Sequence, residues 1–75
     1  MPELSLRAIR RLMSMAGADR ISKKAVLRVR EITEKIIMEI TRRALIFMEH
    51  AHRRTLREDD IINAFRLMFS ALSFV

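Results

Sequence analysis

Cysteine is absent from this 75-residue sequence, and so are tryptophan and tyrosine. Without thiols the chain can form neither a disulfide nor a thiolate metal site, which are the usual means of stabilising very small domains. A single domain over residues 1–75 would bury only about 60% of the surface that its unfolded chain exposes, so its own core is marginal. We therefore expect self-association to supply the missing stability.

Glycine and proline are nearly absent as well, with Gly17 and Pro2 the single examples. No strand-length stretch alternates β-branched and polar residues, so the sequence predicts an all-α fold. The longest uncharged run, residues 67–75, is far shorter than the roughly 20 apolar residues of a membrane helix. No secretory signal is evident, which favours an intracellular protein.

A first helix is predicted from about Ser5 to Met15. Its apolar residues recur at helical spacing and form one stripe, made of Ile9, Leu12, Met13 and Ala16. The opposite face carries Arg7, Arg10 and Arg11. Gly17 can adopt a positive φ and is expected to end this helix, and a loop through Asp19, Arg20 and Ile21 follows.

A second, much longer helix is predicted from Ser22, a suitable N-cap, to about Ala51. Its apolar residues advance by three or four positions throughout: Ala25, Val29, Ile32, Ile36, Ile40, Ala44, Phe47 and Ala51. The polar cluster 52–55 predicts a second loop. Three acids then suit the positive end of a third helix, whose apolar stripe is continued by Ile61, Phe65, Met68 and Leu72.

The long helix cannot be covered by its own chain. A helix of nearly thirty residues is about 43 Å long, whereas a compact globule of this size is roughly 30 Å across. The second half of the helix is apolar around much of its circumference, as expected for burial on several sides. We therefore predict an obligate dimer in which two long helices cross, with a dimer core that includes Ile36, Ile40, Ala44 and Phe47.

Basic residues outnumber acidic ones by 15 to 9, and 12 of the 15 are arginine. The planar guanidinium suits bidentate contact with phosphate. Residues 7–30 hold eight basic residues and a single acid, Asp19, and Lys23 and Lys24 fall in the first turn of the long helix, where the dipole repels cations. A nucleic-acid partner is the leading interpretation, and a solvated basic face is the alternative.

Three segments resemble the histone family. Residues 16–22 (AGADRIS) are similar to the first-loop segment of tail-less archaeal histones, and residues 8–12 (AIRRL) to the first helix of eukaryotic core histone four. Residues 49–61 (EHAHRRTLREDDI) are similar to the second-loop signature of both. The match spans nearly the whole chain and implies the histone fold of short, long and short helices.

The resemblance implies a handshake dimer, formed with itself or with another histone, that packages and bends double-stranded DNA with little sequence preference. The first loop of one subunit would lie beside the second loop of the other. The resemblance and the basic cluster together give the predicted DNA contacts, which are Arg7, Arg10, Arg11, Arg20, Lys23, Lys24, Arg54 and Thr55.

Two further predictions concern the second loop. The resemblance implies that Arg53 and Asp60 form an ion pair within the chain, and that His50 joins dimers by pairing with Asp60 of a neighbouring subunit. Tetramers or superhelical stacks would follow. Two other interpretations of His50 stay open, a surface histidine or a metal ligand with His52, although residues two apart do not share a helical face. No metal or cofactor is predicted.

Two features depart from the family pattern. His52 stands where archaeal relatives often have glycine and eukaryotic ones lysine. Residues 67–75 are apolar and uncharged where archaeal histones usually end in basic residues. This segment either extends the third helix as core or covers a neighbouring dimer.

The predicted function is DNA packaging on the chromosome or nucleoid, with a nucleus or a virion as alternative locations. The alternative function is a histone-fold subunit of a transcription or kinetochore-type complex, which binds protein instead of DNA. An enzyme is not expected, because Ser, His and Asp occur without a nucleophile turn, paired catalytic acids or a glycine-rich phosphate loop. No membrane partner is expected; a basic helix lying on a membrane surface is the third interpretation.

Overall fold

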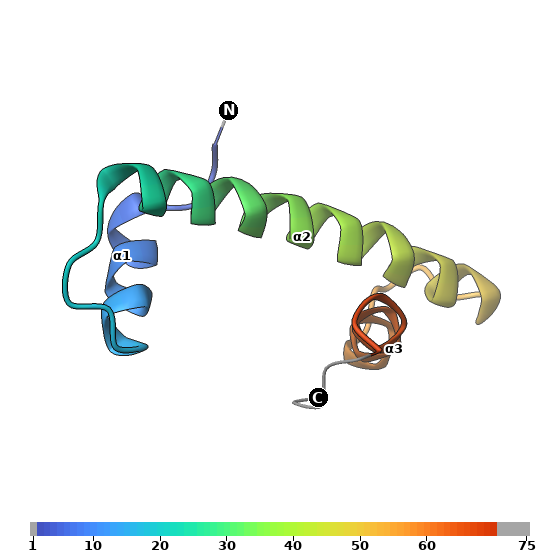
Figure 1. Ribbon diagram of the computed structural model, residues 1–75. Helices are drawn as coiled ribbons and strands as arrows, with labels where there is room; N and C mark the ends of the chain where they lie inside the picture. The colour runs from blue at the N-terminus through green and yellow to red at the C-terminus, as the bar shows by residue number, and fades with distance from the viewer. Residues whose placement is uncertain (1, 71–75) are drawn as a thin grey trace. The chain divides into compact units, whose positions relative to one another are not determined.

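The computed structural model describes residues 2–70, and in that range it has three α-helices and no strand (Figure 1). α1 spans Leu6–Met15, α2 spans Lys23–His50 and α3 spans Glu58–Met68. The predicted all-α order of short, long and short helices is confirmed, and the helix ends lie close to their predicted positions. The predicted continuation of the third helix to Leu72 lies outside the described residues.

The chain divides within α2 into two compact units, residues 1–36 and 37–75. We call them the N-terminal unit and the C-terminal unit. Each has its own buried side chains, which are Ile9 and Val26 in the first and Ala44, Asp60 and Ala64 in the second. A single domain over residues 1–75 stays a prediction.

Side-chain caps begin both helices of the N-terminal unit. The hydroxyl of Ser5 accepts a hydrogen bond from the backbone N–H of Ala8 (3.2 Å), and that of Ser22 accepts one from Ala25 (3.0 Å). Each cap satisfies one of the N–H groups that the first helical turn leaves without an intrahelical partner. The predicted N-cap role of Ser22 is confirmed.

α1 ends in a Schellman motif centred on Gly17, which has a φ of +116°. The N–H of Gly17 donates to the carbonyl of Ser14 and the N–H of Ala18 donates to that of Met13. This pattern needs a positive φ at the residue after the cap, which glycine adopts without a Cβ clash. The prediction that Gly17 ends the first helix is confirmed.

α2 ends in the same motif, with a histidine in the glycine position. The N–H of His52 donates to the carbonyl of Glu49 and the N–H of Arg53 donates to that of Met48. His52 has a φ of +57° and is the one non-glycine residue with a positive φ among residues 2–70. The second loop therefore keeps the glycine-type conformation, at the cost of local strain at His52.

α3 begins with three acids in its first turn, Glu58, Asp59 and Asp60. The carboxylate of Asp60 accepts a hydrogen bond from the backbone N–H of Arg57 (2.9 Å), just before the helix. Negative charge at this end is favourable because the helix dipole is positive there. The prediction that these acids begin the third helix is confirmed.

The described chain has very little core of its own. Its buried apolar residues are Ile9, Val26, Ala44 and Ala64, none larger than isoleucine. Large apolar side chains are instead exposed on all three helices: Leu12, Met15, Ile32, Ile36, Ile37, Met38, Ile46 and Leu67. The first-helix stripe is thus only partly covered by its own chain, because Ile9 is buried while Leu12 is 64% exposed.

The four residues predicted for the dimer core differ in exposure within the lone chain. Ala44 is fully buried, Ile40 and Phe47 are half-buried, and Ile36 is exposed. A surface with this much exposed apolar area is typical of a contact site for another molecule. The dimer itself stays a prediction.

Candidate nucleic-acid interface

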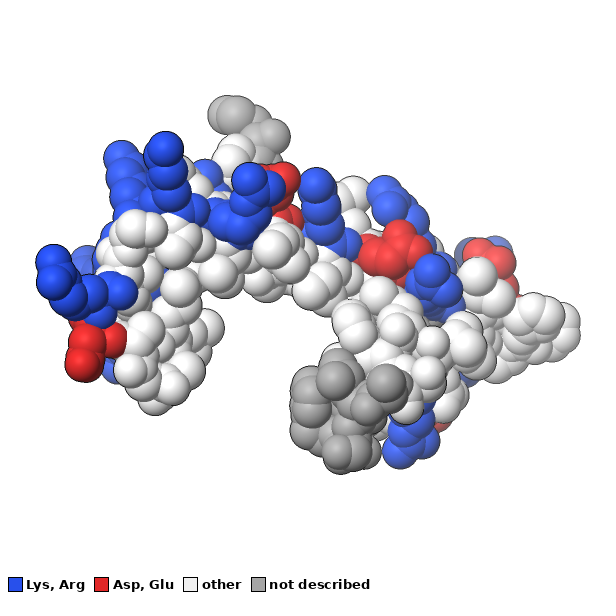
Figure 2. All heavy atoms as spheres, in the orientation of Figure 1, with Lys and Arg blue, Asp and Glu red and all other residues white. Residues whose placement is uncertain are grey.

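Positive charge is unevenly divided between the two units. The N-terminal unit has nine Lys and Arg against four Asp and Glu, whereas the C-terminal unit has six against five. Figure 2 shows blue side chains gathered over the first loop and the start of α2. The charge imbalance therefore lies in the part of the chain where the sequence predicts most of its DNA contacts.

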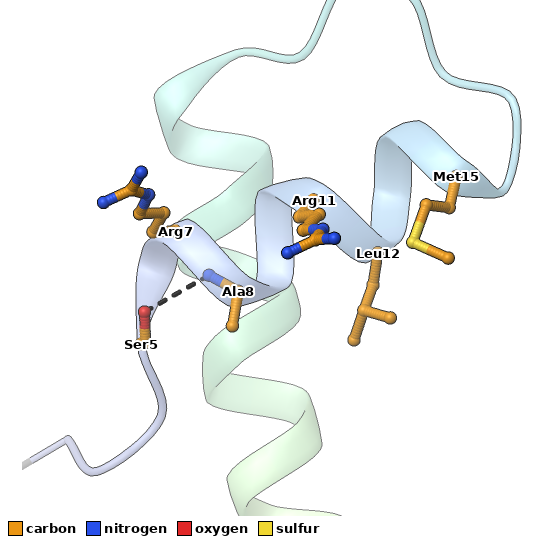
Figure 3. Close-up of a pocket in the computed structure, with 6 residues that line it drawn as sticks. All are labelled: Ser5, Arg7, Ala8, Arg11, Leu12 and Met15. Carbon is orange, nitrogen blue, oxygen red and sulfur yellow. Dashed lines mark hydrogen bonds between the residues drawn. The ribbon is translucent and has the colours of Figure 1, made fainter.

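The start of α1 presents two arginines one helical turn apart. Arg7 and Arg11 are both exposed, and the first turn contains no acid. They border a shallow hollow that is also lined by Ser5, Ala8, Leu12 and Met15 (Figure 3). A helix N-terminus with no acid in its first turn, beside two guanidinium groups, attracts anions.

Arg10 points elsewhere, although it belongs to the same basic cluster in the sequence. Its Nη1 atom donates a hydrogen bond to the backbone carbonyl of Ile21 (2.8 Å). That carbonyl directly follows Arg20 in the first loop. The contact ties the middle of α1 to the end of the loop, and the DNA contact predicted for Arg10 stays a prediction.

The first loop and the first turn of α2 bring together three exposed cations, Arg20, Lys23 and Lys24. None of the three forms an ion pair with any residue in the range 2–70. α2 has no acid in its first turn, in contrast to α3, which has three. The two lysines are therefore uncompensated at the positive end of the α2 dipole, which is unfavourable unless an anion binds there.

In the second loop, Arg53 and Asp60 meet as a bidentate pair. The Nη2 atom lies 2.7 Å from Oδ1 and the Nη1 atom lies 2.9 Å from Oδ2. The Asp60 side chain is almost completely buried, and its hydrogen bonds from Arg53 lower its pKa to about 2 despite burial, which acts to raise it. The pair is thus charged at neutral pH and ties the second loop to α3.

Arg54 and Thr55, the predicted contacts of this loop, are both exposed. The guanidinium of Arg53 also donates to the carbonyl of Thr55 (3.0 Å), which fixes the loop backbone beneath them. Arg57 is not among the DNA contacts predicted from the sequence, although its position two residues after Thr55, in the same loop, could have indicated it. Its side chain is exposed too, so the loop carries a further exposed guanidinium in addition to that of Arg54, and, after the hydrogen bonds from Arg53, its charge helps to lower the pKa of Asp60.

The histidines lie at the end of α2. Glu49, His50 and His52 line one shallow hollow, and His50 is exposed. Both oxygens of Asp60 are occupied within the chain by Arg53, and Oδ2 also by the N–H of Arg57. Among residues 2–70 no three His, Cys, Asp or Glu side chains come close enough to hold a metal ion.

Six of the remaining charged residues of α2 form ion pairs along its exposed surface. Glu31 contacts Arg28 and Lys35, and Glu39 contacts Arg42 and Arg43, at distances of 3.0–3.6 Å. Such exposed pairs add little stability. Each of these four cations has an acidic partner, which distinguishes them from the unpaired cations at the start of the helix. Across the described residues, no helix is long and apolar enough to span a membrane.

Comparison with known proteins agrees with this arrangement. The family described as the core histone domain matches residues 6–67. A subunit of the archaeal histone HAN1 from Thermococcus zilligii is 36% identical over 61 residues, which cover 81% of this chain and 91% of that protein. The probable archaeal histone 3 of Methanocaldococcus jannaschii is 35% identical over 66 residues, covering 88% and 98%. The chain therefore belongs to the histone family, as its three short motifs predict, and is similar to archaeal members of it.

Proposed function

We propose that this histone packages double-stranded DNA, binding and bending it largely independently of sequence. The observation that carries the proposal is the set of exposed cations in the N-terminal unit that have no acidic partner among residues 2–70, which are Arg7, Arg10, Arg11, Arg20, Lys23 and Lys24. Cations on helix starts and loops contact the phosphate backbone, which is the same for every sequence.

The binding unit in this proposal is a handshake dimer, of two identical chains or of this chain with another histone. The exposed apolar residues of α2 support it, because a lone chain leaves them in water. Crossing of two α2 helices would bring the first loop of one subunit beside the second loop of the other. At one DNA contact, Arg20 would then join Arg54 and Thr55 of the partner subunit.

Dimers would associate further into tetramers or superhelical stacks. His50 is exposed at the end of α2 and is available to a neighbouring subunit. Both carboxylate oxygens of Asp60 already accept hydrogen bonds from Arg53, and the Asp60 side chain is only 3% exposed. Pairing between dimers through these two residues therefore requires Asp60 to accept a further hydrogen bond while it keeps its pair with Arg53. The place of action would be the chromosome.

One observation favours the second candidate function, a protein-interaction subunit. Leu12 and Met15 are 64% and 73% exposed on α1, next to the arginines assigned to DNA. A surface of this kind fits a protein partner as well as it fits a second subunit. The two functions differ in what the loop arginines do.

The deciding experiment measures affinity for several unrelated duplexes over a range of salt concentrations. We expect Arg20→Ala with Arg54→Ala to weaken binding to all of them alike, and to lower the slope of log K against log salt by about 0.9 for each lost phosphate contact. Arg66→Ala, in an exposed residue of α3 to which no DNA contact is assigned, is the control and should weaken binding at most about twofold with an unchanged salt slope. Unchanged affinity in the double variant would favour the interaction subunit, and nuclease protection of a reconstituted complex would show whether dimers stack.

A further inference from the structure

An acidic side chain of α2 holds the segment that leads into α1. The Oε2 atom of Glu34 accepts hydrogen bonds from the backbone N–H groups of Glu3 (2.6 Å) and Leu4 (2.8 Å). These bonds, first that from Leu4 and then that from Glu3, lower the pKa of Glu34, and the charge of Arg30 acts in the same direction. Glu34 is half-buried and is charged at neutral pH.

Glu34 differs in this respect from the other glutamates in the middle of α2. Glu31 and Glu39 each contact two basic side chains on the exposed surface. Glu34 has no ion pair in the part of the chain that the structure describes, and its charge is directed at backbone N–H groups instead. The two N–H groups belong to consecutive residues of the backbone. A carboxylate that binds both of them therefore holds that chain segment in place.

The fixed segment determines where α1 starts. Leu4 is followed by Ser5, the extended N-cap residue, and then by the first helical residue, Leu6. Since consecutive Cα atoms are about 3.8 Å apart, holding Leu4 leaves the first turn of α1 little freedom of position. The other anchor of α1 is the contact from Arg10 to the carbonyl of Ile21. α1 is therefore attached to α2 at its start and to the first loop near its middle.

We propose that Glu34 is a positioning residue for DNA binding. Its carboxylate fixes the first turn of α1, and with it Arg7 and Arg11, relative to the cations at the start of α2. The inference rests on the function proposed above, and it concerns a residue that carries the wrong charge for contact with DNA. Removal of a negative charge ordinarily tightens binding to a polyanion such as DNA. Removal of the Glu34 charge should instead weaken it.

The test compares Glu34→Ala with Glu31→Ala, because both remove one glutamate from the same helix and raise the net charge equally. Glu31→Ala should tighten duplex binding about twofold near 0.15 M salt, as expected from the loss of one exposed negative charge. Glu34→Ala should weaken binding at least about threefold and lower the salt slope by about 0.9 to 1.8, the loss of one or two phosphate contacts. Helix content by circular dichroism shows that the variants are folded.

A second pair of variants covers the case in which Glu34→Ala does not fold. In Glu34→Gln the amide oxygen can still accept the two N–H groups, but a neutral acceptor holds them more weakly than a carboxylate does, so the anchor is weakened. This variant should therefore bind no more tightly than the wild type, while Glu31→Gln, which has no anchor to weaken, should bind more tightly. Equal tightening by the two glutamine variants, or by the two alanine variants, would overturn the inference. A wild-type protein that binds no duplex would instead overturn the proposed function, so the two failures can be told apart.

Discussion

Arg53 holds Asp60 by two parallel hydrogen bonds across seven residues of chain, 2.7 and 2.9 Å long, and this pair connects the end of one helix to the start of the next. Arg53 lies just after the cap of α2, and Asp60 lies in the first turn of α3. The same guanidinium donates to the carbonyl of Thr55, and the same carboxylate accepts from the N–H of Arg57. The conformation of the second loop thus depends on two side chains that keep their charges.

Stability should therefore depend on pH through Asp60. Its pKa is lowered from the ordinary value of 3.8 to about 2, so the folded state binds its proton less readily than the unfolded state. The contribution is present above about pH 4 and is lost as the pH falls from about 4 to 2. In thermal unfolding followed from pH 7 to 2, Asp60→Asn should melt below the wild type at neutral pH, and the gap should close in that acidic range.

Asp59→Asn is the control for this prediction. Asp59 is exposed in the same helical turn and has no hydrogen bond or ion pair to another described residue. Its substitution should lower the melting temperature much less. A gap between the wild type and Asp60→Asn that stayed constant down to pH 2 would show that the pair contributes nothing through its charge.

Residues close in sequence made the helices predictable. The spacing of apolar residues, the cap at Ser22, the stop at Gly17 and the acids before Ile61 are all local signals, and each has its predicted counterpart in the structure. The stop at His52 has a weaker signal, because histidine rarely takes a positive φ. The polar cluster around it, and the glycine that archaeal relatives often have at this position, indicate the break.

Contacts between distant residues could not be predicted in this way. Arg10 belongs to a basic cluster in the sequence, but the position of the Ile21 carbonyl, eleven residues away, decides where its side chain goes. Glu34 looks like any surface glutamate until the chain thirty residues earlier folds back onto it. Helical periodicity places Leu12 on an apolar stripe without revealing that its own chain leaves it exposed.

Substitutions at the two helix stops should change stability in opposite directions. His52→Gly removes a side chain from a left-handed conformation that costs about 1–2 kcal/mol, which stabilises the folded state. Glycine also increases the entropy of the unfolded chain, which offsets part of this stabilisation. We expect a net gain of about 0.5–1 kcal/mol in the free energy of unfolding. Gly17→Ala should cost about 1–2 kcal/mol, because φ is +116° although a Cβ would meet no atom within 4 Å. Urea unfolding of both variants measures these values, and a destabilised His52→Gly would contradict the role given to His52.

Dimerisation should be sensitive to substitutions on one face of α2 and insensitive to substitutions on the other. Ile36 lies in the predicted seam, whereas Ile46 is flanked at helical spacing by Arg42, Arg43 and Glu49. Burying one isoleucine contributes about 1.5–3 kcal/mol, and a symmetric dimer contains two copies. Ile36→Asp should therefore sediment as a monomer and lose the concentration dependence of its melting temperature, while Ile46→Asp should remain a dimer. A wild type that stays monomeric and folded on dilution would exclude the obligate dimer.

The lysines in the first turn of α2 should show a conflict between stability and binding. A cation near a helix N-terminus costs about 0.3–1 kcal/mol, and neither Lys23 nor Lys24 has an acidic partner among residues 2–70 to offset this. Lys23→Gln with Lys24→Gln should therefore raise the free energy of unfolding by about 0.6–2 kcal/mol without DNA, and at the same time weaken duplex binding with a smaller salt slope. Lys35→Gln, in the middle of the helix and paired with Glu31, should do neither to a comparable extent. Unfolding curves with and without duplex measure both quantities on one sample. If the double variant were stabilised and bound DNA as well as the wild type, the unfavourable charges at this helix end would have an explanation other than phosphate.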